Sequence, residues 1–214
     1  MAMLQHLSLL DKCIIEFDHA LKLLTEKPVG QRPNPAKNEQ DIPLLPTEKS
    51  HTVALMRINH AGEISAQALY RGQALTADLP FIRKKLTEAA LEEIDHLNWC
   101  RDRLEELKGH TSYLDPFWYL GSFIIGAIAG LAGDHWSLGF IAETENQVSA
   151  HLSKHLNQLN PNDKKTNTIL KQMQIDEEKH AAMAKISGGI DLPAAIQQAM
   201  QLLSKVMTSI AYYV

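Results

Sequence analysis

The sequence predicts an all-α protein, and three observations support this prediction. Apolar residues recur at steps of three and four along most of the chain, which is the spacing of one face of a helix. Prolines and glycines gather in a few short stretches that separate these segments. No run of alternating β-branched residues bounded by turns occurs in the 214 residues, so the sequence indicates no strand.

The N-terminal segment, residues 3–26, is expected to form an amphipathic helix. Its apolar residues at helical spacing are Leu4, Leu7, Leu10, Ile14, Phe17, Leu21 and Leu24. Residues 28–46 hold five of the nine prolines, and proline lacks the amide hydrogen that a helix needs. We therefore divide the chain into an N-terminal helix at 1–27, a Pro-rich linker at 28–47 and a helical bundle at 48–214.

Five further helical segments are expected after the linker. They lie at about 47–75, 81–108, 117–158, 163–186 and 193–212. Thr47 and Glu48 favour the first start, because a hydroxyl can cap a helix and an acid suits its first turn. The 117–158 segment is expected to break near Gly133 and Asp134. The last segment is amphipathic and carries one charge, Lys205.

Composition argues against several classes of protein. The chain has 21 Lys and Arg against 25 Asp and Glu, a net charge of −4, so nucleic acid is not an expected partner. Two cysteines, Cys13 and Cys100, are too few for a disulfide scaffold and favour a reducing compartment. The first residues show neither a basic region nor a cleavage site typical of a secretory signal.

One stretch, residues 116–133, runs 18 positions without a charged side chain. This length lies at the lower edge of what crosses a membrane, and four glycines interrupt the stretch. We expect a buried bundle helix, or a face that dips into a bilayer, rather than a membrane span. For the 193–212 helix, packing in the bundle core and exposure of its apolar face are equally favoured interpretations.

A repeated spacing of acids and histidines predicts the chemistry. The candidate metal ligands are Glu63, Glu93, His96, Glu145, Glu177 and His180. They form two copies of one pattern, in which a glutamate is followed 30 or 32 positions later by Glu-x-x-His. Residues three apart share a helix face, so four antiparallel helices can direct four carboxylates and two imidazoles at one point.

Such a cluster needs cations. Four buried carboxylates without counter-ions would repel one another and protonate, whereas two divalent cations would neutralise them. Oxygen-rich ligation with two imidazoles suits iron or manganese, and this ligand pattern is that of ferritin-like di-iron proteins. The sequence therefore predicts a ferritin-like four-helix bundle with a di-iron centre, together with an N-terminal helix and a C-terminal amphipathic helix.

Two further Glu-x-x-His matches are interpreted as ordinary helix surface. Glu16 and His19 are separated from Glu48 and His51 by five prolines, which prevent the helix hairpin that a second site would need. Glu48 also stands where an acid favours the start of a helix.

Several neighbours of the candidate ligands have weaker claims. Glu92, Glu143 and Glu178 are expected to point to other faces, in solvent or between helices. Asp95 and Asp176 could orient an imidazole, but surface positions are favoured for both. For His60 and His151, a role beside the ligands and an ordinary histidine environment remain equally open.

Five motifs resemble one known family. They are RINHAGE at 57–63, LYRGQ at 69–73, EEIDHL at 92–97, GDHWSLGF with AETE between 133 and 145, and DEEKHA at 176–181. Together they resemble the demethoxyubiquinone hydroxylases, the di-iron monooxygenases of ubiquinone biosynthesis. The resemblance covers nearly everything from about residue 48 onward.

The resemblance implies a role for each ligand. It places Glu63 and His96 on one iron, Glu145 and His180 on the other, and Glu93 and Glu177 between them. Glu143 is a looser alternative to Glu145, which fits both the repeat offset and the family motif better. The implied reaction is ring hydroxylation of demethoxyubiquinol with O₂ as co-substrate and with NADH or the quinol itself as reductant.

The resemblance also implies where the protein works. A quinol with a polyprenyl tail cannot lie in water, so 116–133 and 193–212 are expected to form an apolar face at the bilayer. The implied location is the cytoplasmic side of the cell inner membrane, bound peripherally, with other enzymes of quinone synthesis as partners. Three alternatives are a ferritin-like protein for iron storage or detoxification, a di-iron hydroxylase of tRNA, and a non-catalytic membrane scaffold for quinone synthesis.

Overall fold

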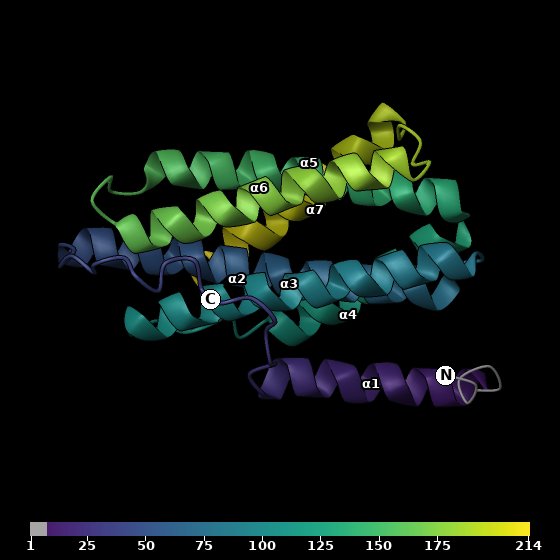
Figure 1. Cartoon of the computed structure of the whole chain (residues 1–214), viewed down its shortest axis with the longest axis horizontal. Coiled ribbons are helices and arrows are strands. Elements are labelled where there is room, and N and C mark those ends of the chain that lie inside the picture. Colours follow the sequence, from purple (N-terminus) through teal and green to yellow (C-terminus); the bar gives the residue numbers. More distant parts are fainter. Residues whose placement is uncertain (1–7) are drawn as a thin grey trace.

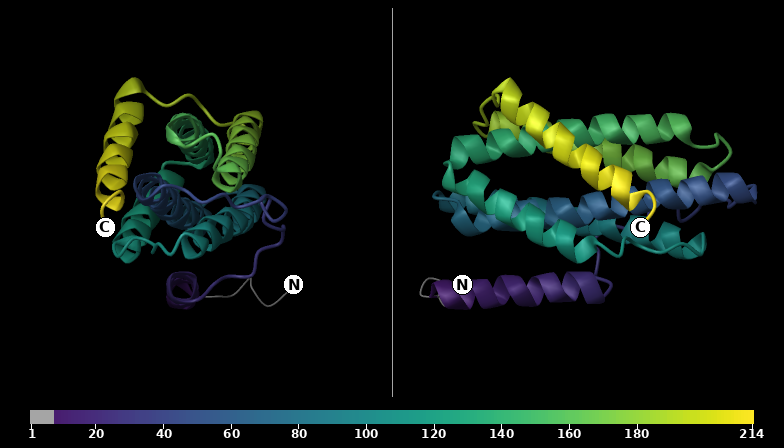
Figure 2. Two further views of the ribbon diagram at one scale, coloured as in Figure 1. Left: turned by 90° about the vertical axis from the view of Figure 1, so that its left-hand side faces the viewer. Right: turned by 180° about the vertical axis from the view of Figure 1, so that it is seen from behind.

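The structure, a computed structural model, describes residues 8–214 and is all-helical there, as predicted (Figure 1). Its helices are α1 Leu9–Thr25, α2 Pro46–Thr76, α3 Pro80–Glu106, α4 Asp115–Leu131, α5 Asp134–Gln158, α6 Lys164–Ile186 and α7 Ala194–Ala211. Helices α2, α3, α5 and α6 form the bundle, with the α5–α6 pair lying over the α2–α3 pair (Figures 1 and 2). Short loops join the helices of each pair, which makes them antiparallel neighbours.

Two apolar clusters fill the two ends of the bundle. One cluster includes Leu55, Leu104, Leu152, Leu170 and Met173, and the other includes Tyr70, Leu86, Leu138, Ala142 and Ala184. On every one of the four helices, the candidate metal ligands lie in sequence between a residue of the first cluster and a residue of the second. The apolar core therefore seals the polar centre of the bundle from both ends.

The predicted helix boundaries hold to within a few residues for most of the chain. Residues 3–7 of the first expected helix, with Leu4 and Leu7, lie outside the described residues. Ser8 and Asp11 form a capping box at the start of α1. At the start of α2, the carboxylate of Glu48 accepts a hydrogen bond from the Leu45 amide at 2.9 Å. The cap residue is Leu45 rather than Thr47, which lies inside the helix.

The predicted break in the 117–158 segment is confirmed, and it separates α4 from α5. Helix α4 packs along the outer side of α2, which is possible at close range because of Gly126. A Cβ atom on this glycine would lie 2.9 Å from the Leu69 Cα atom, closer than Cβ contacts normally come. Helix α7 crosses the same side of the molecule as α4 (Figure 2).

Both outer helices leave apolar side chains exposed. Those of α4 are Phe117, Leu120, Ile124, Ile128 and Leu131, and those of α7 are Ile196, Leu202, Leu203, Val206 and Ile210. Of the α7 residues only Ala211 is buried, so the interpretation of 193–212 as ordinary bundle core is wrong. Within residues 8–214, no helix is both long and apolar enough to cross a membrane.

The residues between α1 and α2, 26–45, form no helix, as their prolines predict, and we call them the strap. The strap is not a free tether, because it lies along the bundle and buries Ala36 in the cluster that holds Leu55 (Figure 1). The division of the chain at 27 and 47 into separate units stays a prediction.

Candidate metal centre

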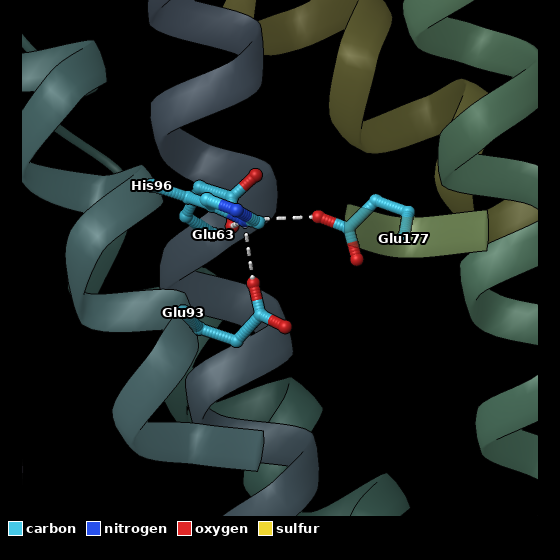
Figure 3. A group of neighbouring side chains, drawn as sticks. All are labelled: Glu63, Glu93, His96 and Glu177. Atoms are coloured by element: carbon cyan, nitrogen blue, oxygen red, sulfur yellow. Dashed lines mark hydrogen bonds and ion pairs between the residues drawn. The ribbon is translucent and has the colours of Figure 1, made fainter. Parts of the chain in front are cut away.

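The six predicted ligands meet at the middle of the bundle. Helix α2 supplies Glu63, α3 supplies Glu93 and His96, α5 supplies Glu145, and α6 supplies Glu177 and His180. They fall into two groups, Glu63, Glu93, His96 and Glu177, and Glu145, Glu177 and His180. In each group the donor atoms lie within 4.8 Å of one another, and Figure 3 shows the first group.

The distances place two glutamates between the two histidines. The Nδ1 atom of His96 lies 3.0 Å from Glu177 Oε1, 3.1 Å from Glu93 Oε2 and 3.6 Å from Glu63 Oε2. The Nδ1 atom of His180 lies 3.1 Å from Glu93 Oε1 and 3.3 Å from Glu177 Oε2. Glu93 and Glu177 thus present one oxygen to each imidazole, whereas Glu63 belongs to the His96 group alone.

The carboxyl groups divide into two electrostatic kinds. Burial raises the pKa of Glu63 and of Glu145 well above the ordinary value, because a carboxylate loses its hydration inside the bundle. Burial acts in the same direction on Glu93 and Glu177, but hydrogen bonds from the two imidazoles outweigh it and lower the pKa of both. Charge in the centre is therefore concentrated on Glu93 and Glu177.

The two imidazoles respond to that charge. Burial opposes protonation of His96 and His180, but the surrounding carboxylates outweigh burial and raise the pKa of both, to about 12 for His180. In the metal-free chain the positive charge that the carboxylates require is thus supplied by protons. The same charge could be supplied by cations at the same place.

The donor atoms fit a pair of divalent cations. Within residues 8–214, the buried atoms Glu63 Oε2, Glu93 Oε1 and Glu177 Oε1 lie near an imidazole Nδ1 atom but receive no aligned hydrogen bond. Buried acceptors of this kind are normally paired, so each has an unused capacity to bind a cation. Four carboxylates and two imidazoles match the preferences of iron or manganese, and the described residues of the cluster include no thiolate.

Each histidine has an acid at its other nitrogen, and the two acids cross between helices. The Nε2 atom of His96 lies 3.2 Å from Asp176 Oδ2, and that of His180 lies 2.7 Å from Glu92 Oε2. Each acid directly precedes the glutamate of the opposite Glu-x-x-His pair. Such a partner fixes the orientation of a ligating imidazole.

The surface positions favoured for two of the neighbouring acids are wrong. Asp95 and Asp176 are both buried, and each accepts a hydrogen bond from Arg32 that compensates for the lost hydration. Burial raises the pKa of Asp176, but the hydrogen bonds from His96 and Arg32 dominate and hold it well below its ordinary range. Glu92 is exposed and reaches between helices, which agrees with the interpretation made for it.

The histidines left open do not contact the candidate ligands. His60 Nδ1 lies 3.2 Å from Asp115 Oδ2, on the α4 side of α2. The ring of His151 lies 4.0 Å from that of His155, and burial lowers the pKa of His151 to about 4. The ordinary environment is thus the better interpretation of both.

The remaining Glu-x-x-His matches lie outside the metal centre, as expected, but their side chains are only partly exposed. Glu16 binds the guanidinium of Arg71, and Glu48 accepts a hydrogen bond from Asn160 at 2.8 Å. Sequence reasoning missed two residues that contact the centre or its partners, Arg32 and Tyr70. The phenol of Tyr70, which is buried, donates a hydrogen bond to Glu145 Oε1.

Comparison with known proteins identifies similar chains. A model of the family described as "Ubiquinone biosynthesis protein COQ7" matches residues 50–211. A protein of Legionella pneumophila (strain Paris) named 3-demethoxyubiquinol 3-hydroxylase is 53% identical over 209 residues, 97% of this chain and 98% of that protein. Proteins of the same name from Nitrosococcus oceani, 51% identical, and Coxiella burnetii (strain RSA 331), 49% identical, cover 98% of this chain and 99% and 98% of their own lengths.

Proposed function

Because the chain belongs to the ubiquinone biosynthesis protein COQ7 family, we propose that it is a 3-demethoxyubiquinol 3-hydroxylase that uses O₂. The observation that supports this most directly is the buried set of four glutamates and two histidines. The relatives of nearly equal length carry an enzyme's name, which favours hydroxylation over iron storage or a passive scaffold. No second function has a specific observation in its favour.

The proposed ligand roles follow the distances. Glu63 and His96 would hold one iron ion, Glu145 and His180 the other, and Glu93 and Glu177 would bridge them because each faces both histidines. When bound, the two iron ions supply the redox chemistry that activates O₂. One oxygen atom enters the ring and the other leaves as water, so each turnover needs two electrons from NADH or a quinol.

The surrounding residues have supporting roles in this proposal. Asp176 and Glu92 accept hydrogen bonds from the outer nitrogens of the two histidines, which leaves both Nδ1 atoms facing the centre. Tyr70 holds Glu145 by its hydroxyl hydrogen bond. The apolar clusters at both ends of the bundle exclude water from the reacting atoms.

The proposal includes a place for the substrate. Helices α4 and α7, which carry the exposed apolar side chains, cross the same side of the molecule, and we propose that a polyprenyl tail or a lipid bilayer covers this side (Figure 2). We propose peripheral binding at the cytoplasmic side of the inner membrane. An Ile124→Asp, Ile128→Asp variant should lose flotation with phosphatidylethanolamine–phosphatidylglycerol vesicles. Ile175→Asp, on the opposite side in α6, is the matched control and should bind as the wild type does.

Quinone profiling tests the proposed reaction. Cells that lack this chain should accumulate demethoxyubiquinone, and the wild-type chain should restore ubiquinone. Glu177→Ala should fail to restore it, because a bridging ligand is lost. Normal ubiquinone in the deleted cells would contradict the proposal. The mass of the native particle would then test iron storage, which requires a closed shell of many subunits.

A further inference from the structure

The strap reaches the metal centre through one side chain, that of Arg32. Its Nε atom donates to Asp95 Oδ2 at 2.9 Å, and its Nη1 atom donates to Asp176 Oδ2 at 2.7 Å. Its Nη2 atom lies 3.3 Å from His96 Nε2, and the guanidinium lies over the ring of Trp99, 4.9 Å from the centroid. One guanidinium thus joins α3 to α6 directly beside a candidate iron ligand.

The backbone of the strap is fixed at the same place. The amides of Gln31 and Arg32 donate to Asp95 Oδ1 at 2.6 and 3.1 Å. The side chain of Asn98 donates to the Pro28 carbonyl at 2.9 Å. A Cβ atom on Gly30 would lie 2.7 Å from Asp95 Oδ1, so this close approach requires glycine. Asp95 therefore receives both the chain and the side chain of the strap.

The geometry gives Arg32 an effect on only one histidine. The Asp176 oxygen that accepts from Arg32 is the same oxygen that lies 3.2 Å from His96 Nε2. The planar fork of an arginine fixes two carboxylates at once, so it sets the position of Asp176 and thereby the orientation of the His96 ring. His180 has the exposed Glu92 at its Nε2 atom instead, and the arginine does not contact it.

We propose that Arg32 is a positioning residue for the His96 half of the metal centre, and that the strap is therefore part of the site. This inference rests on the proposed function, since it assumes that the six ligands hold metal. It predicts that loss of the guanidinium weakens the binding of one metal ion and leaves the other unchanged. A strap that served only the stability of the fold would affect both ions alike, or neither.

The test is anaerobic titration of the full-length chain with Fe(II), followed by Mössbauer spectroscopy of ⁵⁷Fe(II)-loaded protein. Wild type should bind two ions. Arg32→Gln should bind one of them normally and the other about 10- to 100-fold more weakly, as expected for the loss of a group that orients a ligand. Only one of the two ferrous signals should change.

Two further variants separate positioning from stability. Lys27→Gln removes the strap's ion pair with Asp102, which does not touch the centre, and should leave both Fe(II) affinities and both signals as in wild type. Arg32→Lys keeps the charge but loses the fork, so it should recover part of the lost affinity. Thermal melting of each metal-free variant measures any loss of stability directly.

Three results would overturn the inference. They are unchanged Fe(II) binding in Arg32→Gln, equal weakening of both ions, or the same defect in Lys27→Gln. A failure of the proposed function looks different. Suppose that the wild type binds two Fe(II) ions and that Arg32→Gln responds as predicted, but that no hydroxylated quinol forms. The positioning role of Arg32 would then stand, and the proposed reaction would be rejected.

Discussion

The two halves of the candidate metal centre contain the same residue types but have different surroundings. The His96 half is closed, since the His96 side chain is 0% exposed, its partner Asp176 is buried, and Arg32 covers both. The His180 half is open, since the His180 side chain is 11% exposed and its partner Glu92 is 57% exposed. Tyr70, in turn, contacts the second half alone, through Glu145.

This difference shows that the repeat extends to the candidate ligands and to the acid beside each histidine, but no further. Both Glu-x-x-His pairs are preceded by an acid that crosses to the opposite histidine, so the repeat includes that acid as well. Beyond that acid the surroundings differ, because Asp176 accepts hydrogen bonds from Arg32 of the strap and from Gln172 and Lys179, whereas Glu92 is exposed to solvent. Two metal ions with the same ligands are therefore expected to differ in affinity.

The largest expected effect separates bridging from terminal ligands. Glu93→Gln or Glu177→Gln should prevent binding of both ions, because each carboxylate faces both histidines. Glu63→Gln or Glu145→Gln should prevent the binding of only one metal ion. Iron analysis of the purified variants measures this directly. Retention of two ions in a bridging variant would show that the halves do not share these ligands.

The next effect concerns pH. The pKa of His96 is raised and that of His180 is raised to about 12, so both imidazoles hold a proton at pH 7 in the metal-free chain. Metal binding requires the neutral ring, so each ion must displace a proton and its affinity should rise with pH. We expect at least about tenfold tighter binding of each Fe(II) ion per pH unit, measured by titration at pH 6.5 and 7.5. The raised pKa values of Glu63 and Glu145 act in the same direction, since their protons are displaced as well. A pH-independent affinity would contradict this assignment.

A third prediction compares the two crossing acids. Asp176→Asn should lower the affinity for one Fe(II) ion by about 10- to 100-fold, because it removes the buried partner of His96. Glu92→Gln should lower the affinity for the other Fe(II) ion by at most about fivefold, because an exposed ion pair contributes at most about 1 kcal/mol. Paired titrations of the two variants measure the difference, and equal losses would show that burial does not distinguish the halves.

The smallest effect concerns Tyr70. Tyr70→Phe keeps the packing of the ring but removes the hydroxyl hydrogen bond to Glu145. We expect a loss of about 1 kcal/mol in the free energy of unfolding, measured with a chemical denaturant. The Mössbauer signal of the iron ion in the His180 half should shift, and the signal of the other iron ion should not. A shift in the His96 signal would mean that the halves are coupled more tightly than the hydrogen bonds suggest.

The meeting of the six candidate ligands could be predicted from the sequence alone, because helix geometry is local. Three residues separate glutamate and histidine in each pair, and this spacing places both on one face whatever the rest of the chain does. The helices and the break before α5 follow from equally local signals, proline, glycine and apolar spacing. The side of α7 that is exposed could not be predicted in this way, because its amphipathic pattern fits packing in the bundle core and exposure at a membrane surface equally well.

The missed residues belong to contacts without a local signal. Arg32 meets Asp176 across 144 positions, and nothing in a proline-rich segment fixes its path over the bundle. Asp176 looks like any acid on a helix until that contact is known. Tyr70 could have been found, because it lies seven residues after Glu63, two turns further along the same face of α2.

The long separation between Arg32 and Asp176 also sets an order of folding. During synthesis the strap leaves the ribosome well before α6, because Asp176, the α6 partner of Arg32, is added 144 residues later. Contacts so distant in sequence form slowly, because a long loop has to close first. The strap can therefore contact Asp95 of α3 before α6 has been made, whereas its contact with Asp176 forms only after α6 is complete.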